Sequence, residues 1–278
     1  MWQNQKTSKE IVTMKSKIAE AIKMKYSPVA ILWTDERPEK ALQFKEGRWG
    51  CETFLLCSAA KGRVAAADRE TFGCIGGGVG LGFGNQYLNF PGGIEYYIST
   101  GNPEFCNTEM GKKIAEDMPE LVDGEGYVKN PELAKEFVNS LPMIDVPTRY
   151  VVFKPIELVS DDEEPKVIIF LVNPDQLSAL VVLANYDRES NVNVIAPFGA
   201  GCHQIGILPY REGESLEPNA IIGLTDLSAR KRMMRMVDKD ILSFTVPFKM
   251  FQEMEGNVEG SFLEKETWAS VIGIKEGD

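Results

Sequence analysis

The amino-acid sequence predicts an α+β (mixed α/β) fold, formed as a single compact domain around a mixed sheet. Short runs rich in β-branched residues alternate with capped or amphipathic helical segments along the whole chain, so that strands and helices intermingle. The 278 residues are enough to bury one large core, and their 44% hydrophobic and 26% charged content is typical of a soluble globular protein. We therefore expect one domain at residues 8–272, without a separate linker.

The first third of the chain predicts two helices and two strands. Residues 8–24 place apolar side chains at helical spacing, which indicates an amphipathic helix. Residues 29–33 are typical of a buried strand, and residues 64–67 of a shorter one. Residues 51–61 are expected to be helical and to end at Gly62, which suits a left-handed C-cap.

The middle of the chain is dominated by glycine. Residues 72–101 are expected to form loops, with a short strand near residues 96–99. Two helices are predicted after this segment, at residues 109–118 and 131–140. The second is marked by Asn130, a good N-cap, and by Pro131 at the first helical position.

The second half of the chain is more regular. Strands are expected at residues 150–154, 167–172, 192–196, 220–223 and 241–246. Helices are expected at residues 174–186, with Asn173 as the cap, at residues 226–237, and from residues 248 and 262 onward. The acidic residues 161–165 are expected to form an exposed hairpin turn.

Composition excludes several classes of function. A net charge of −11 argues against a nucleic-acid partner, because phosphates would be repelled. No apolar run approaches the roughly 20 residues that a membrane span needs, and the first residues lack a signal-peptide pattern. These observations predict a cytoplasmic protein, in which cysteines stay reduced and more often serve metals or chemistry than disulfides.

Four of the five cysteines lie beside glycine-rich or helix-starting segments: Cys51, Cys57, Cys74 and Cys202. An iron–sulfur cluster needs three or four thiolates and no fixed spacing when the ligands come from different loops. We therefore predict that these cysteines bind an iron–sulfur cluster of the 4Fe-4S type, or another metal. Cys51 and Cys57 are six residues apart, so they can converge only if Cys51 precedes the first helical turn.

The glycines beside these cysteines predict an adjoining pocket. Gly76, Gly77, Gly78 and Gly201 lack a Cβ, so their backbone amides can approach a ligand, and a small anionic molecule is the expected one. The spacing fits neither a phosphate-binding loop nor a dinucleotide-binding fingerprint. A tightly packed irregular loop explains the same glycines.

Other interpretations of the cysteines stay open. Without a metal, Cys74 or Cys202 would be an activated thiol in a thiol-dependent enzyme, with His203 or Arg230 supplying a cation to lower its pKa. Alternatively, the thiols are simply packed in the core, and the protein binds a small molecule without chemistry. Self-association and catalytic activity are not decided by the sequence.

Residues 72–76 resemble residues 198–206 if four residues are inserted, which suggests two related halves around a pseudo-symmetric core. A wider resemblance rests on the segments Glu70-Thr71-Phe72-Gly73-Cys74, Asn173-Pro174-Asp175-Gln176-Leu177-Ser178-Ala179-Leu180, Ala200-Gly201-Cys202 and Thr225-Asp226-Leu227-Ser228-Ala229-Arg230. Together they are similar to the archaeal and bacterial family called domain of unknown function 169, over roughly residues 18–268. The resemblance implies one domain found mostly in anaerobic prokaryotes, which favours oxygen-sensitive cofactors, and it implies no established activity.

Overall fold

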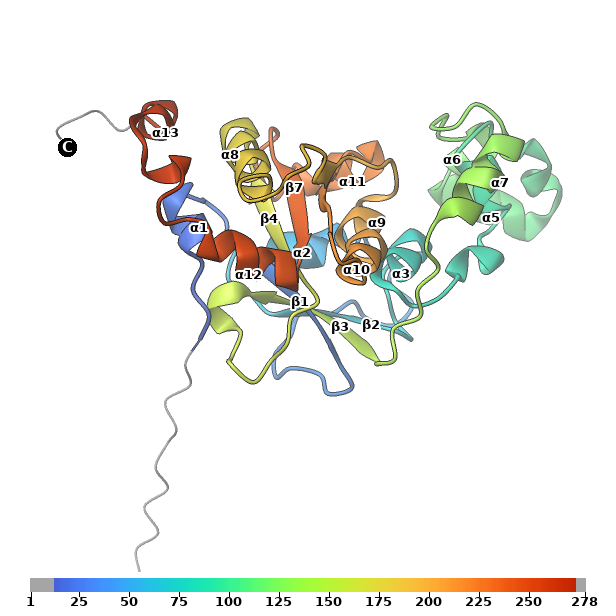
Figure 1. Ribbon diagram of the computed structural model, residues 1–278. Coiled ribbons are helices and arrows are strands. Elements are labelled where there is room, and N and C mark those ends of the chain that lie inside the picture. Colours follow the sequence, from blue (N-terminus) through green and yellow to red (C-terminus); the bar gives the residue numbers. More distant parts are fainter. Residues whose placement is uncertain (1–12, 274–278) are drawn as a thin grey trace, which may run out of the picture.

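The computed structural model describes residues 13–273. Residues 8–12, the start of the expected domain and of its first helix, lie outside the described residues. A seven-stranded sheet in the order β2-β3-β1-β4-β7-β6-β5 forms the centre of the fold (Figure 1). Its strands are β1 (Val29–Thr34), β2 (Ala65–Asp68), β3 (Tyr150–Pro155), β4 (Val167–Val172), β5 (Val194–Ile195), β6 (Ala220–Gly223) and β7 (Leu242–Pro247). Neighbouring strands are antiparallel except β5 and β6, which are parallel, so the predicted mixed α/β class is confirmed.

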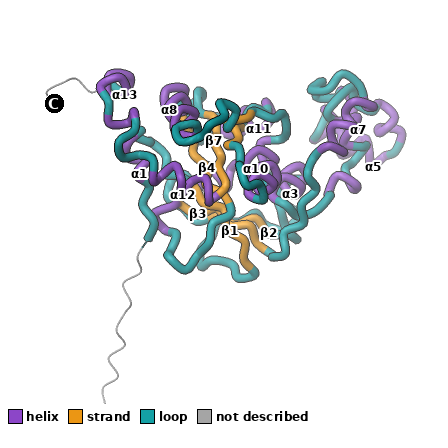
Figure 2. Tube along the Cα trace, in the orientation of Figure 1, coloured by secondary structure: helices purple, strands orange, loops and turns teal. Residues whose placement is uncertain are grey.

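Helices surround this sheet, as Figure 2 shows. The α-helices are α1 (Lys17–Ala21), α2 (Thr53–Ala59), α3 (Ile75–Leu81), α4 (Ile94–Tyr97), α5 (Glu109–Asp117), α6 (Glu120–Asp123), α7 (Pro131–Ser140), α8 (Pro174–Ala184), α9 (Gly201–Ile205), α10 (Ile207–Gly213), α11 (Leu227–Met233), α12 (Phe248–Gly256) and α13 (Glu266–Val271). Single 3-10 turns are η1 (Gln86–Asn89), η2 (Pro103–Asn107), η3 (Ile156–Leu158) and η4 (Phe262–Glu264). Within residues 13–273, none of these helices is long and apolar enough to cross a membrane.

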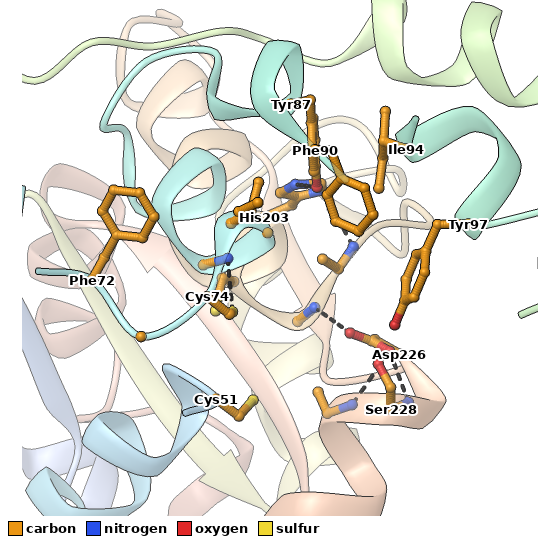
Figure 3. Close-up of a pocket in the computed structure, with 18 of the residues that line it drawn as sticks. Cys51, Phe72, Cys74, Tyr87, Phe90, Ile94, Tyr97, His203, Asp226 and Ser228 are labelled. Atoms are coloured by element: carbon orange, nitrogen blue, oxygen red, sulfur yellow. Dashed lines mark hydrogen bonds between the residues drawn. The ribbon is translucent and has the colours of Figure 1, made fainter. Parts of the chain in front are cut away.

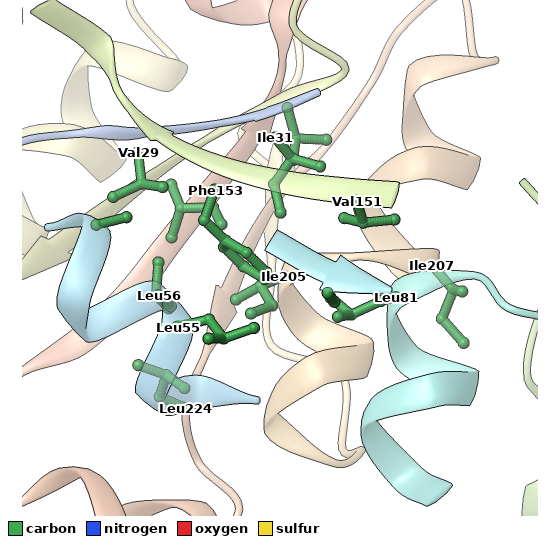
Figure 4. Packing of buried hydrophobic residues seen from close by; sticks show 14 of the residues in the cluster. Val29, Ile31, Leu55, Leu56, Leu81, Val151, Phe153, Ile205, Ile207 and Leu224 are labelled. Atoms are coloured by element: carbon green, nitrogen blue, oxygen red, sulfur yellow. The ribbon is translucent and has the colours of Figure 1, made fainter. Parts of the chain in front are cut away.

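The central strands are apolar on both faces, because each face is covered by helices. Along β4, Ile169 and Leu171 pack into one core with α2, α3, α9 and α10, while Ile168 and Phe170 pack into another with α1, α8 and α12. Figure 4 shows the first core, where Phe153 of β3 meets side chains from α2 and α9. This core supports the helices that carry the candidate site.

A helical lobe formed by α4 to α7 stands apart from the sheet at one side of the molecule (Figure 1). Its cap at α7 is the one predicted, because the side chain of Asn130 accepts a hydrogen bond from Leu133 N and Pro131 occupies the first turn. The cap at α8 is also confirmed, since Asn173 and Gln176 form a reciprocal capping box. Local sequence signals therefore placed these helix starts correctly.

Two predictions about local structure, besides that of the glycine run, are wrong. The expected strand near residues 96–99 overlaps α4, because this apolar segment packs within the helical lobe and has no neighbouring strand. The acidic residues 161–165 do not form a hairpin turn, because β1 lies between β3 and β4 in the sheet. β1 comes from far earlier in the chain. The residues of β3, β4 and the segment between them do not reveal that β1 lies between these two strands in the sheet.

The glycine run predicted as a loop is instead the helix α3, which is the largest difference from the sequence-based expectation. Glycine in a helix costs roughly 1 kcal/mol per residue relative to alanine, so local propensity opposes this structure. Packing requires it, because a Cβ on Gly80 would lie 2.6 Å from Cβ of Cys202, and a Cβ on Gly77 would overlap the Glu52 side chain. The glycines thus allow α3 to lie directly against its neighbours.

The two segments that resemble each other in sequence lie side by side. Residues 72–76 lead into α3 and residues 198–206 lead into α9, and the close approach of Gly80 to Cys202 joins these two helices. Both segments therefore start helices that meet at the same place in the fold.

Candidate functional site

A cavity of about 500 Å³ lies between the helical lobe and the part of the molecule that carries the sheet. Its lobe side is lined by apolar and aromatic residues: Tyr87, Phe90, Ile94, Tyr97, Tyr127, Phe137 and Val138. Its other side is lined by the residues around the predicted cysteines, including Phe72, Cys74, Ala200, His203 and Asp226 (Figure 3). A mainly apolar cavity of this size with a few polar groups is the usual form of a small-molecule site.

Three of the four predicted cysteines line this one cavity. Cys51 lies just before α2, Cys74 is the N-cap of α3, and Cys202 lies in the first turn of α9. Cys51 Sγ is 2.9 Å from Oγ1 of Thr53, and Cys74 Sγ accepts a hydrogen bond from Gly77 N at 3.2 Å. The fold thus brings together thiols from three segments that are distant in sequence.

Cys57 is not part of this group. It lies within α2, is fully buried, and packs among the apolar side chains of the core beside β1 and β3. Cys51 does precede the first turn of α2, as convergence would require, yet the helix directs Cys57 to the core. Among residues 13–273, no group of three or more His, Cys, Asp or Glu side chains is arranged to hold a metal ion.

The cavity thiols are held in their neutral form. Burial raises the pKa of Cys74 to about 12, and the nearby charges of Glu52 and Cys51 act in the same direction. Burial also raises the pKa of Cys202 well above its ordinary value, with further contributions from Cys51 and Cys74. The pKa of Cys51 is raised by burial too, although its hydrogen bond with Thr53 opposes the shift. A thiolate at Cys51 therefore disfavours a thiolate at Cys74 and at Cys202.

Neither cation considered from the sequence offsets this effect. Arg230 donates hydrogen bonds to the carbonyl oxygens of Leu224 and Ile241, so its guanidinium holds the loops around β6 and β7. Burial lowers the pKa of His203 to about 4, so the imidazole is neutral at pH 7. Arg232 lowers the pKa of Cys51, but not enough to reverse the shift that burial causes.

The four predicted glycines differ in position. Gly76, Gly77 and Gly201 line the cavity. Gly78 does not line it, because it is buried against the ring of Phe72, where a Cβ would lie 2.8 Å from the nearest ring carbon. At Gly76 a Cβ would meet only the Tyr87 hydroxyl, at 3.6 Å, so this position faces open space.

His203 and Tyr87 form the central polar pair of the cavity wall. The hydroxyl of Tyr87 lies 2.9 Å from Nε2 of His203, and Nδ1 of His203 accepts a hydrogen bond from Ala200 N at 3.2 Å. Both side chains are buried, and their rings meet edge to face (Figure 3).

Charged residues of α11 and its cap also line the cavity. Asp226 caps α11 through hydrogen bonds from Ser228, and it also accepts one from Gly201 N at 3.1 Å, which ties α11 to α9. The guanidinium of Arg232 lies over the ring of Trp49, 4.0 Å from its centroid, and both residues line the cavity. Arg232 and Trp49 thus supply a positive charge on an aromatic support.

Glu52 is a fully buried carboxyl behind Cys74. One of its oxygens accepts a hydrogen bond from Gly73 N, and the other has no hydrogen-bond partner among the described residues. Burial raises its pKa to about 7. A buried carboxyl with one free oxygen carries an unfavourable charge at high pH.

Sequence reasoning missed Tyr87 and Glu52. Tyr87 lies in a turn after the glycine run, and nothing in its neighbours distinguishes it from a surface tyrosine. For Glu52 a weak signal exists, because it is a lone carboxyl between Cys51 and an apolar helix. The roles of Tyr87 and Glu52 depend on contacts with residues that are distant in the sequence.

Comparisons with known proteins identify a family and no individual relative. No curated protein and no solved structure matches the chain significantly. The sequence model of the family labelled DUF169 and described as "Uncharacterised ArCR" matches residues 17–257, which is most of the chain. The resemblance noted in the sequence is thereby confirmed, and the chain belongs to the domain of unknown function 169 family.

Proposed function

We propose that this protein binds a small, mainly apolar organic molecule in the cavity lined by Cys51, Cys74 and Cys202. The observation that carries the proposal is the cavity itself, about 500 Å³ in volume and walled by aromatic side chains from two parts of the fold. Burying an apolar molecule there gains roughly 25 cal/mol for each Å² removed from water. Polar groups at its two ends would orient the ligand.

The ligand that fits best is planar and carries a negative charge at one end. The rings of Phe90, Tyr97 and Phe137 offer flat apolar surfaces. Arg232 has no carboxylate within ion-pair distance among the described residues, and its guanidinium can donate two parallel hydrogen bonds to a ligand carboxylate. These features support a small aromatic acid as the ligand class.

A cavity-filling variant tests this proposal. Gly76→Leu adds a side chain where the structure leaves open space, whereas Gly256→Leu adds the same side chain to an open position at the end of α12. With benzoate as the probe, titration calorimetry should show binding to the wild type and to Gly256→Leu, and at least tenfold weaker binding to Gly76→Leu. Equal binding by both variants would show that the ligand does not occupy the cavity.

A second candidate function is an iron–sulfur cluster bound by Cys51, Cys74 and Cys202. The favouring observation is that these thiols come from three separate segments and that negative charge on Cys51 raises the pKa of both Cys74 and Cys202. Iron ions would offset that repulsion, and thiolates are the ligands that such clusters use. With three protein ligands, one iron would face the cavity. The reducing cytoplasm, which we infer as the compartment, would keep the thiols available.

Anaerobic reconstitution with iron and sulfide tests the second candidate. Cys51→Ser, Cys74→Ser and Cys202→Ser should each lose bound iron and acid-labile sulfide, whereas Cys57→Ser and Cys106→Ser should retain them. Cys57 and Cys106 are matched controls because neither lines the cavity. Iron-free wild-type protein after reconstitution would exclude the cluster and leave the binding proposal standing.

A further inference from the structure

We propose that Tyr87 is a fixed hydrogen-bond donor to the molecule in the cavity, which therefore carries an acceptor oxygen, such as that of a carbonyl or carboxyl group, beside Tyr87. This inference rests on the proposed binding function and adds to it the chemistry and the position of one end of the ligand.

The first step concerns the tautomer of His203. Its Nδ1 lies 3.2 Å from Ala200 N, and a backbone N–H can only donate a hydrogen bond. Nδ1 must therefore be unprotonated. In a neutral imidazole the single proton then resides on Nε2.

The second step concerns the direction of the bond between His203 and Tyr87. Nε2 carries the proton, so it donates to the Tyr87 oxygen across 2.9 Å. A tyrosine hydroxyl has one proton of its own, and the histidine cannot accept it. That proton must point to another acceptor.

The third step concerns where this acceptor lies. Among residues 13–273 the Tyr87 hydroxyl makes no other hydrogen bond, although Tyr87 is only 9% exposed. The hydroxyl lies beside Gly76, where both residues line the cavity. A buried donor without an acceptor costs about 1–3 kcal/mol, so a ligand oxygen placed there is favoured.

The surroundings keep this arrangement stable. Nδ1 of His203 accepts the hydrogen bond from Ala200 N, so the imidazole carries one proton and is neutral in this arrangement. Burial also raises the pKa of Tyr87, so its hydroxyl remains protonated. The hydroxyl proton of Tyr87 is thus available to a ligand.

The first experiment uses the fact that His203 is the single histidine of the chain. Labelling with ¹⁵N-histidine gives one imidazole, and a long-range ¹H–¹⁵N spectrum distinguishes its two nitrogens. The protonated nitrogen should be the one coupled to both ring hydrogens, which is Nε2. Protonation at Nδ1 would reverse the bond to Tyr87 and overturn the inference.

The second experiment compares two neutral probes of similar shape, acetophenone, which has an acceptor oxygen, and isopropylbenzene, which has none. Tyr87→Phe should weaken acetophenone binding by about fivefold, the value of one ordinary hydrogen bond, and leave isopropylbenzene binding unchanged. Tyr186→Phe is the matched control and should leave the binding of both probes unchanged, because Tyr186 does not line the cavity and its hydroxyl donates to the carbonyl oxygen of Gly260 at 3.3 Å.

The outcomes separate this inference from the binding function. If Tyr87→Phe binds both probes as the wild type does, the donor role is wrong and the cavity function stands. If the wild type binds neither probe, the proposed function is wrong and the inference falls with it.

Discussion

Gly80 of α3 lies directly against Cys202 of α9, so closely that a Cβ on the glycine would be 2.6 Å from Cβ of the cysteine. This contact joins the two segments that bring Cys74 and Cys202 to one cavity. The glycines of α3 are therefore requirements of helix packing, and the position of two candidate thiols depends on them.

Gly80→Ala should destabilise the protein by about 1–3 kcal/mol, because the added methyl group overpacks the contact with Cys202. The measurement is the free energy of unfolding in urea. Gly256→Ala is the control, since this helical glycine has open space around its Cβ position and should gain up to about 1 kcal/mol. Two variants of equal stability would contradict the packing argument.

Glu52 should make stability fall as the pH rises. Its pKa is about 7 in the folded protein and near 4.5 in the unfolded chain, so the folded state binds its proton more tightly. Stability from this group is therefore greatest below about pH 4.5 and is lost as the pH rises through 7, by about 3 kcal/mol. Glu52→Gln removes the titration and keeps an acceptor for Gly73 N.

The measurement for Glu52 is the difference in unfolding free energy between Glu52→Gln and the wild type at several pH values, in protein prepared without added iron. The unfolding free energy of Glu52→Gln, relative to that of the wild type, should increase steadily between pH 5 and pH 8. A difference that is constant over this range would mean that Glu52 is already ionised at pH 5.

The cavity thiols should alkylate slowly at neutral pH. Because their pKa values are raised, only a small thiolate fraction exists at pH 7, and it grows about tenfold per pH unit. Iodoacetamide labelling followed by peptide mass spectrometry should show Cys51 and Cys74 reacting much faster at pH 9 than at pH 7. Cys57, which is fully buried, should stay unlabelled in the folded protein. Rapid labelling of Cys74 at pH 7 would instead support a thiol-dependent enzyme.

Asp226→Ala should cost about 1–2 kcal/mol of stability, because it removes the cap of α11 and the acceptor for Gly201 N. Asp226→Asn keeps one side-chain oxygen as an acceptor and should therefore lose less stability than Asp226→Ala. Asn173→Ala, which removes the cap of α8, serves as a cap variant on a helix that does not line the cavity. Benzoate affinity should fall in Asp226→Ala and stay unchanged in Asn173→Ala, since α11 lines the cavity and α8 does not.

Much of the local structure follows from short stretches of sequence. The caps at Asn130 and Asn173 and the strands at β3, β4 and β7 were predicted, because each depends on neighbouring residues. Long-range pairing was not, since β1 enters the sheet between β3 and β4. The helix α3 was also missed, because its stability comes from contacts that only glycine permits.

The candidate site shows the same division. The sequence alone indicated the chemical groups of the site, which are thiols beside glycine and a single histidine. It also indicated the family of the chain. The tertiary structure determined which of these residues lie close together. It buries Cys57 in the core and brings the hydroxyl of Tyr87 within hydrogen-bond distance of His203. The physical reason is that residue type and helix capping are properties of neighbours in the chain, whereas a cavity is made by packing between segments that the chain does not connect directly.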